Sequence, residues 1–390
     1  MNSTLIPKVP GAVRILLPVL LGMLSAQACQ ICLPMPTESL ADRILAAEHL
    51  MLAREHPEHP YQIEAVRTLK GDLTKVPPVD VFLDSSTRRQ LSSNPDLSLL
   101  CGWFGQEEGW RRLALHDESV APIVSTIIDR AAAWKTDPDE RLRYFAGFLG
   151  HEDSELSDLA HIEVARAPFS KVLQHADRIP REQLHEKLRN LRRMKWHALY
   201  ILFLSQSDDP RDHEFIRNGL ADVARYGLAT RAAAFATALI EIDGPAAIER
   251  LAELYLGAEK RRPEELAALH AALMTHGNEG QPELLDPIVA AYARLLERNP
   301  ALAPDLADDL TRWQRFDHAE AFSRYLTDTT PDLAATARIR GHLRAAAEAT
   351  APGPSAQPAR LAPIFVIAGG MLLVPLLLAV NGRSKAAQAA

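Results

Sequence analysis

The uncharged segment from Leu361 to Val380 restricts the fold of this chain more than any other feature. Its 20 residues match the ~20 that an α-helix needs to cross the core of a bilayer. Arg383 and Lys385 follow the segment, and basic residues near a membrane helix prefer the cytoplasmic side. We therefore predict a single transmembrane helix at 361–380 and a cytoplasmic tail at 381–390. The alternative, a buried core helix, leaves the basic flank unexplained.

The amino terminus has the pattern of a secretory signal peptide. Lys8 and Arg14 precede the apolar run Ile15–Leu24, which Ser25-Ala-Gln-Ala28 follows. A basic start, an apolar centre and small residues at a cleavage site define such a peptide, so we expect residues 1–28 to be removed. The body then lies outside the inner (cytoplasmic) membrane, in agreement with the basic tail inside. An uncleaved anchor, or a lipid on Cys29, are the alternatives.

The charge between the two terminal segments excludes one class of partner. Lys8, Arg14, Arg383 and Lys385 are four of the 43 basic side chains, so the middle of the chain has 39 against 50 acidic side chains, a net charge of −11. Nucleic-acid binding depends on lysine and arginine that neutralise phosphates. We therefore expect no nucleic acid as partner.

Residues 29–118 alternate short apolar runs with turn signals, as a small all-β domain does. We predict strands in five places, of which the first is one long strand or a bulged pair: 43–53, 61–69, 78–83, 99–104 and 110–115. Five short strands in about 90 residues favour a closed barrel, because closure hides the sheet edges.

The chain has three cysteines, Cys29, Cys32 and Cys101, in a compartment expected to be oxidising. One disulfide between the amino terminus and Cys101, with one thiol left over, is the simplest arrangement. The alternative is a redox pair at Cys29 and Cys32. Haem attachment needs histidine after the second cysteine, and this chain has Leu33 there.

Three features of the first region resemble the netrin-like domain, an OB-type barrel shared by tissue inhibitors of metalloproteinases and bacterial envelope proteins. They are the expected amino-terminal Cys29, a strand ending Leu52-Ala-Arg54, and Val66-Arg-Thr-Leu-Lys-Gly71. In the inhibitors, the amine and carbonyl of the amino-terminal cysteine chelate the zinc of the protease, and the motif is Cys-x-Cys, whereas this chain has Cys-x-x-Cys. The resemblance, over Cys29 to Glu118, therefore implies a barrel and an amino-terminal disulfide in which Cys101 matches the later cysteine.

Residues 119–345 change to helical periodicity, with loops marked by Asp, Pro and Gly. Helix pairs are expected to begin near Trp196, Arg231, Glu264 and Ala303, at spacings of 35, 33 and 39 residues. Helix pairs at this spacing indicate an α-solenoid of the HEAT or tetratricopeptide type. The aromatic and glycine pattern of tetratricopeptide repeats is absent, so the chain resembles HEAT repeats more closely. A globular helical bundle is the alternative. Residues 346–360, rich in Ala, Pro and Ser, are expected to form a stalk.

Several polar groups invite a functional interpretation. A basic cluster either faces anionic lipid or an acidic partner, or is a solvated helix face paired with Glu182 and Glu186, which we favour. Its members are Arg189, Arg192, Arg193 and Lys195, with His185 and His197. His56-Pro-Glu-His-Pro60 has two imidazoles, but zinc needs further fixed ligands, so we expect a loop.

The acidic pairs Asp208-Asp209 and Asp308-Asp309, and Asp153, are expected to act as helix caps. Trp134, Trp196 and Trp313 are expected to pack between repeats. No motif of a phosphate loop, a metalloprotease or a serine hydrolase occurs in the sequence. We therefore name no catalytic, cofactor-binding or metal-binding residue and expect no cofactor.

The sequence thus predicts a multidomain, mostly α-helical envelope protein with a small amino-terminal β-barrel, an α-solenoid and one carboxy-terminal membrane helix. Solenoids present long binding surfaces. We expect a non-enzymatic adaptor or scaffold that binds an envelope protein or a glycan, with a small-molecule substrate not expected. The alternatives are a protease-inhibitor module, or a thiol oxidoreductase that uses Cys29 and Cys32.

Overall fold

The computed structural model describes residue 36, residues 38–257 and residues 260–351. Among them, those up to Ala346 belong to one compact unit and those from Ala347 to a second. The predicted signal peptide 1–28, Cys29, Cys32 and the predicted span 361–380 lie outside these ranges. Within the ranges, no helix combines the length and the apolar character that crossing a membrane requires.

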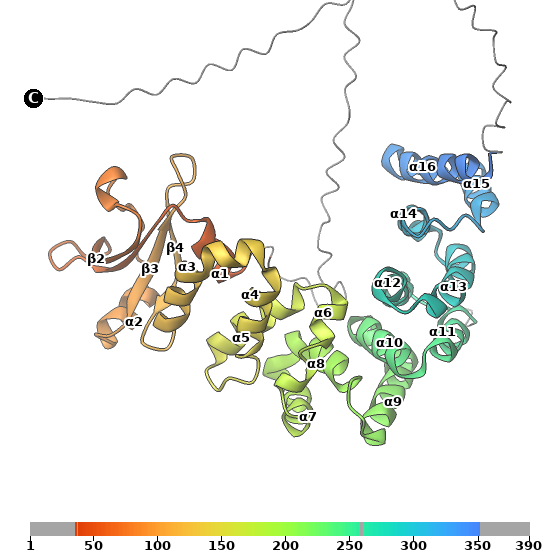
Figure 1. Ribbon diagram of the computed structural model, residues 1–390, viewed down its shortest axis with the longest axis horizontal. Coiled ribbons are helices and arrows are strands. Elements are labelled where there is room, and N and C mark those ends of the chain that lie inside the picture. The colour runs from red at the N-terminus through yellow and green to blue at the C-terminus, as the bar shows by residue number, and fades with distance from the viewer. Residues whose placement is uncertain (1–35, 37, 258–259, 352–390) are drawn as a thin grey trace, which may run out of the picture. The chain divides into compact units, whose positions relative to one another are not determined.

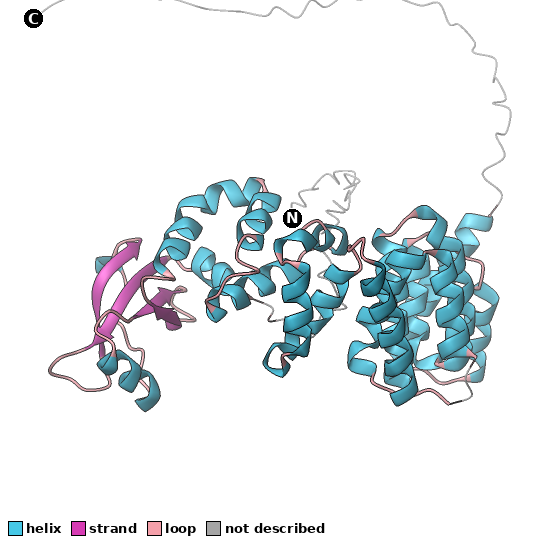
Figure 2. Cartoon of the chain, turned by 90° about the horizontal axis from the view of Figure 1, so that it is seen from below, coloured by secondary structure: helices cyan, strands magenta, loops and turns pink. Residues whose placement is uncertain are grey.

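The described chain is mostly helical and has one small antiparallel sheet (Figures 1 and 2). This confirms the fold class at that level. The sheet has four strands in the order β2-β1-β3-β4. Their bounds are β1 His49–Glu55, β2 Ile63–Lys70, β3 Ser98–Trp103 and β4 Trp110–His116. The last two and β2 agree closely with the predicted strands.

The prediction of a five-stranded closed barrel is wrong, because the sheet is open and β2 and β4 form its edges. Residues 78–83 begin with Pro78 and follow Pro77, and neither proline has an N–H to donate to a ladder. They run extended and join the hairpin through a hydrogen bond of 3.1 Å from the Leu83 N–H to the Tyr61 carbonyl. Their Val79 and Val81 pack on one face of the sheet.

The first predicted strand, 43–53, is divided between helix α1 (Leu40–Ala46) and β1. A capping box starts the helix: the Ser39 hydroxyl accepts the Asp42 N–H at 3.1 Å, and the Asp42 carboxylate accepts the Ser39 N–H at 3.0 Å. Such a pair satisfies two helix donors, which outweighs the strand pattern of the residues that follow.

Helices cover the other face of the sheet. Leu50, Leu52 and Leu100 point into a core shared with α1 and α3 (Ala121–Thr136). The same core includes apolar residues of α4 (Pro138–Ala146) and α5 (Ser154–Ala165). The first three helices after the sheet therefore pack on it. The change from strands to helices near residue 119 is consequently not a boundary between two hydrophobic cores.

An ionic cluster also joins α1 to these helices. The Arg141 guanidinium lies 2.6 Å from the Asp42 carboxylate and 2.9 Å from the Glu163 carboxylate. Arg166 makes a second ion pair with Asp42. Burial alone raises the pKa of Asp42, but the hydrogen bonds from Ser39, Arg141 and Arg166 outweigh burial and lower this pKa to about 2.

The lowered pKa of Asp42 predicts a specific acid sensitivity. Because the folded pKa is below the unfolded value of 3.8, the ionised carboxylate stabilises the fold above pH 4, and this contribution is lost as the pH falls towards 2. Asp42→Asn is expected to lower the free energy of unfolding by about 2 kcal/mol at pH 7 and to match the native chain near pH 2. Urea denaturation between pH 7 and pH 2 measures the difference. Asp139→Asn, which removes an exposed ion pair with Lys171, is the control, and a deficit of Asp42→Asn that persists at pH 2 contradicts the assignment.

The rest of the described chain is a series of antiparallel helices. Their bounds are α2 Ser85–Ser93, α6 Phe169–Leu173, α7 Arg181–Arg189, α8 His197–Leu204, α9 Pro210–Tyr226, α10 Ala229–Asp243, α11 Pro245–Leu251, α12 Pro263–Glu279, α13 Leu285–Arg298, α14 Ala303–Arg312, α15 Ala319–Asp328 and α16 Leu333–Thr350. α2 lies beside β1, whereas the others follow α5 in sequence.

The predicted helix pairs begin within two residues of α8, α10, α12 and α14. α10 packs on both α8 and α12, and α11 packs on α13. Figure 1 labels α8, α10, α12 and α14, which follow one another along the helical region. One continuous core of buried side chains extends from Leu142 to Ile339. The arrangement is compatible with an α-solenoid, since equivalent helices of successive pairs lie against one another.

Candidate functional site

Two adjoining cavities lie where α6 meets the carboxyl ends of α8, α10 and α12. The first has a volume of about 370 Å³ and the second of about 270 Å³. Leu173 lines both. We call the combined hollow the α6 groove. Its residues are Phe169, Ser170, Leu173, Gln174, Ala176, Asp177, Ile179, Pro180, Arg181, Leu184, Phe203, Leu204, Gln206, Ser207, Ile240, Glu241, Gly244, Pro245, Glu279, Gly280, Gln281, Glu283 and Leu284.

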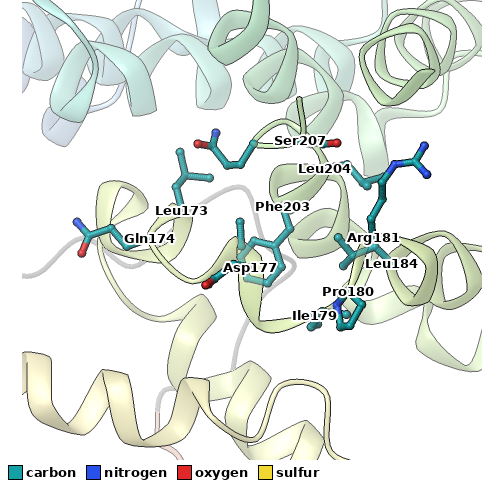
Figure 3. A pocket seen from close by; sticks show the side chains of 12 residues that line it. Leu173, Gln174, Asp177, Ile179, Pro180, Arg181, Leu184, Phe203, Leu204 and Ser207 are labelled. Carbon is teal, nitrogen blue, oxygen red and sulfur yellow. The ribbon is translucent and has the colours of Figure 1, made fainter. Parts of the chain in front are cut away.

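The first cavity combines an apolar floor with charged sides. Figure 3 shows the Phe203 side chain among aliphatic neighbours such as Leu173 and Leu184, with Asp177 on one side and Arg181 on the other. Arg181 is already paired with Asp212, at 2.6 Å. A concave apolar surface with a few polar groups is the usual form of a binding site.

Glu279 holds α6 in place from the last turn of α12. Its carboxylate accepts the Phe169 N–H at 3.1 Å, the Ser170 N–H at 2.9 Å and the Ser170 hydroxyl at 3.0 Å. These are free donors of the first turn of α6, and a carboxylate at a helix start is stabilised by the helix dipole. The two walls of the second cavity are therefore joined across 110 residues of sequence.

His276 and Glu241 form an unusual pair beside the second cavity. The His276 ring is fully buried, and its Nε2 lies 3.1 Å from the Thr237 carbonyl. Because a carbonyl only accepts, Nε2 carries the proton and Nδ1 is a free acceptor. Nδ1 has no hydrogen-bond partner among the described residues and lies 3.5 Å from the Glu241 carboxylate.

This geometry places a lone pair against a carboxylate, which disfavours the ionised form of Glu241. Burial raises the pKa of Glu241, although the Gln206 amide at 3.5 Å opposes the change. Burial also lowers the pKa of His276 to about 4, so the ring is neutral at pH 7. A cationic group of a ligand beside Glu241 would favour the ionised carboxylate, and its N–H could donate to the free Nδ1 of His276.

The charges along the α6 groove are mostly negative. Asp177, Glu241, Glu279 and Glu283 face the single base Arg181. The groove is therefore acidic, as the net charge of the middle of the chain predicts.

Comparisons of the chain with protein-family models, with curated proteins and with solved structures find no match.

The structure pairs the predicted basic cluster differently from our expectation. Arg193 and Lys195 each lie 2.6 Å from the Asp158 carboxylate of α5, and His185 lies 2.6 Å from Asp212 of α9. The expected intrahelical pairing with Glu182 and Glu186 is therefore wrong for these three. The reason is that antiparallel packing brings acids of neighbouring helices closer than those of the same helix.

The acidic pairs have different roles. Asp153 and Asp209 are the N-caps of α5 and α9, as predicted. Asp308 and Asp309 instead lie inside α14, so their assignment as caps is wrong. Asp309 is buried and contacts Nε2 of His270 at 2.8 Å and the hydroxyl of Tyr292 at 3.1 Å. Its role is to satisfy these polar groups between helices.

The three tryptophans pack against neighbouring helices, but Trp134 does so in the core shared with the sheet, so its placement between repeats is wrong. Trp134 lies against Phe145, Trp196 against His161 and Trp313 against Tyr292, with ring centres 4.9 to 5.7 Å apart.

Cys101 is a free, fully buried thiol on β3. Burial raises its pKa to about 12, so it is not a nucleophile at neutral pH. Its two expected disulfide partners, Cys29 and Cys32, lie outside the described residues, and the bridge stays a prediction.

Residues His56 to Pro60, which were predicted to be a loop, form a turn. Nδ1 of His56 accepts the N–H groups of Glu58 and His59 at 3.1 and 3.2 Å. Among the residues that the structure describes, no group of three or more potential ligands is placed to hold a metal ion.

The sequence did not identify Phe203, Glu241, His276 or Glu279 as site residues. A usable signal existed in the repeat itself. Gln206, Glu241 and Glu279 lie near the carboxyl ends of α8, α10 and α12, at spacings of 35 and 38 residues. Polar residues at equivalent positions of successive helix pairs meet at one edge of the stack.

Proposed function

We propose that this protein is a membrane-anchored extracytoplasmic adaptor that holds a basic segment of a protein partner in the α6 groove. The observation that carries the proposal is the buried, unpartnered Nδ1 of His276 beside Glu241, in an acidic groove with an apolar floor. A lysine or arginine next to Glu241 restores the balance of charge, and an adjacent apolar side chain fits near Phe203.

The proposal includes the location predicted from the sequence. A cleaved signal peptide, a stalk at 346–360 and a membrane helix at 361–380 place the body at the outer surface of the inner membrane. The HEAT-like assignment is part of the same proposal, and so is a relation of the first region to the netrin-like domain through its sequence motifs, without the closed barrel. A protein partner fits the α6 groove better than a glycan, because sugar hydroxyls carry no positive charge to offset the carboxylates.

The alternative functions depend on other residues. A protease inhibitor needs the free amino group of Cys29, and a thiol oxidoreductase needs Cys29 and Cys32. Cys32→Ser separates them from the adaptor, because partner binding in the α6 groove is expected to be unchanged by it.

The test is selection of binding peptides from a random displayed library by the full-length chain in detergent micelles. We expect the selected peptides to contain lysine or arginine beside an apolar residue. Glu241→Gln is expected to weaken their binding about tenfold, because it removes a partly screened ion pair with the ligand. Binding to the native chain should weaken as the pH falls through the raised pKa of Glu241, since its carboxylate takes up a proton, and the variant should respond less.

Glu320→Gln provides the matched control, because Glu320 lies on α15 with its side chain 92% exposed. It makes the same change of charge and should leave binding unchanged. Selection of acidic peptides, or equal binding by Glu241→Gln and the native chain, would contradict the proposal.

A further inference from the structure

The amino-terminal ends of α8, α10 and α12 lie at the opposite end of these helices from the α6 groove. Three segments occupy this end: 187–196, 223–232 and 260–262. They contain ten lysines and arginines and no acidic residue. The local charge is thus opposite in sign to the net charge of the middle of the chain.

Contacts between the three segments make them one surface, which we call the basic edge. Nε2 of His197 lies 3.2 Å from the Lys187 and the Asn190 carbonyls. Burial lowers the pKa of His197, and the nearby charge of Arg231 lowers it further, which places α10 beside the first segment. Arg261 donates to the Ala224 carbonyl, which joins the third segment to the second.

Only part of this positive charge is neutralised by the protein. Arg193 and Lys195 pair with Asp158, and Arg261 and Arg262 pair with Glu265. The other six bases have no carboxylate within 4 Å in the described part of the chain. They are Lys187, Arg189, Arg192, Arg225, Arg231 and Lys260.

Apolar side chains project from the same edge. Leu191 is 76% exposed, Met194 54%, Tyr226 64% and Leu228 51%. These are four of the eight most exposed large apolar side chains of the described residues. They lie on the short helix 191–196 and on the turn between α9 and α10, and none of them lines a cavity described above.

We infer that the basic edge docks on the surface of an anionic phospholipid bilayer. Unpaired arginine and lysine attract anionic headgroups, and projecting Leu, Met and Tyr enter the boundary between headgroups and acyl chains. A protein interface usually centres its apolar residues in a packed, desolvated patch. Here the exposed apolar residues belong to two separate segments and alternate with bases in the sequence, which fits a fluid surface better than an acidic protein.

This inference does not depend on the proposed ligand of the α6 groove, which lies at the other end of the helices. If it is correct, a membrane-docked molecule presents the α6 groove away from the lipid, where a partner can reach it.

The test is hydrogen exchange of the full-length chain in nanodiscs of phosphatidylcholine alone and of phosphatidylcholine with 30 mol% phosphatidylglycerol (roughly a bacterial anionic content). We expect the amides of 190–196 and 225–231 to exchange about fivefold more slowly in the anionic discs. This protection should disappear in about 0.5 M NaCl, because salt screens exposed charges. Equal exchange in both discs at low salt would overturn the inference.

Two sets of variants sharpen the result. Arg192→Glu with Arg231→Glu should abolish the protection, and Leu191→Ser with Leu228→Ser should reduce it. The control, Arg340→Glu with Arg344→Glu on α16, makes the same change of charge at exposed positions and should retain it. If the control loses the protection to the same extent, total charge is responsible. If polyglutamate protects the same amides in place of lipid, the basic edge binds an acidic protein. Either outcome overturns the inference.

Discussion

Replacing Asp309 by alanine is expected to lower the free energy of unfolding by about 3 kcal/mol. The Asp309 carboxylate is buried and contacts His270 at 2.8 Å, the Tyr292 hydroxyl at 3.1 Å and Arg312 at 2.8 Å. His270 and Tyr292 are themselves buried, so removal of the carboxylate leaves their polar atoms without a partner. Urea denaturation followed by far-ultraviolet circular dichroism measures the loss.

The adjacent residue provides the control for this prediction. Asp308 lies on the same helix and pairs with Arg338 at 2.7 Å, but its side chain is 43% exposed. Asp308→Ala is expected to cost less than about 1 kcal/mol, as exposed ion pairs do. If the two variants unfold at the same urea concentration, the buried contacts of Asp309 do not have the role assigned to them.

Replacing Arg141 by alanine is expected to have a still larger effect, of about 3–5 kcal/mol, because it leaves a buried charge unpaired. Glu163 has a side chain that is 6% exposed, and its ion pair is with Arg141. Asp42 retains Arg166 as a partner, so most of the loss is assigned to Glu163. The midpoint of thermal unfolding measures the effect.

A double variant distinguishes loss of charge balance from loss of packing. Arg141→Met with Glu163→Met removes both charges and keeps much of the volume, and we expect it to recover most of the stability. Arg143→Ala is the control on the same helix, since Arg143 is 59% exposed and pairs with an exposed Asp137. If the double variant is as unstable as Arg141→Ala, the guanidinium acts through packing.

Helix pairs were the most predictable part of the fold. The starts of α8, α10, α12 and α14 follow from apolar periodicity and from loops marked by Pro, Gly and Asp, which act within a few residues. The N-caps Asp153 and Asp209 were predictable for the same reason, since a cap depends on the residues that directly follow it.

The errors occur where a specific contact, or the position of a residue within its helix, outweighs the apolar pattern. Residues 78–83 have the alternation of a strand, but Pro77 and Pro78 cannot pair, and the segment packs across the sheet. Residues 43–46 alternate in the same way, and a capping box between Ser39 and Asp42 makes them helical. Asp309 resembles a cap in sequence, but its position inside α14 turns it towards His270 of α12.

The candidate site was even less visible in the sequence than the fold. The α6 groove depends on Glu279 reaching the first turn of α6 across 110 residues, and on Glu241 lying beside the lone pair of His276. No local sequence signal distinguishes these residues, because the residues on either side of each are typical of a helix. Only the repeat spacing relates them.

The sequence by itself determined the starts of α8, α10, α12 and α14, three of the strands, the acidic balance of the body and the basic cluster around Arg192. All of these are set by neighbouring residues or by composition. The tertiary structure alone decided that the sheet stays open, which acids neutralise which bases, and that the bases gather at one end of the helices and the carboxylates at the other. The physical reason is that hydrogen bonds and ion pairs act over a few ångströms, so they depend on which distant segments the packing brings together.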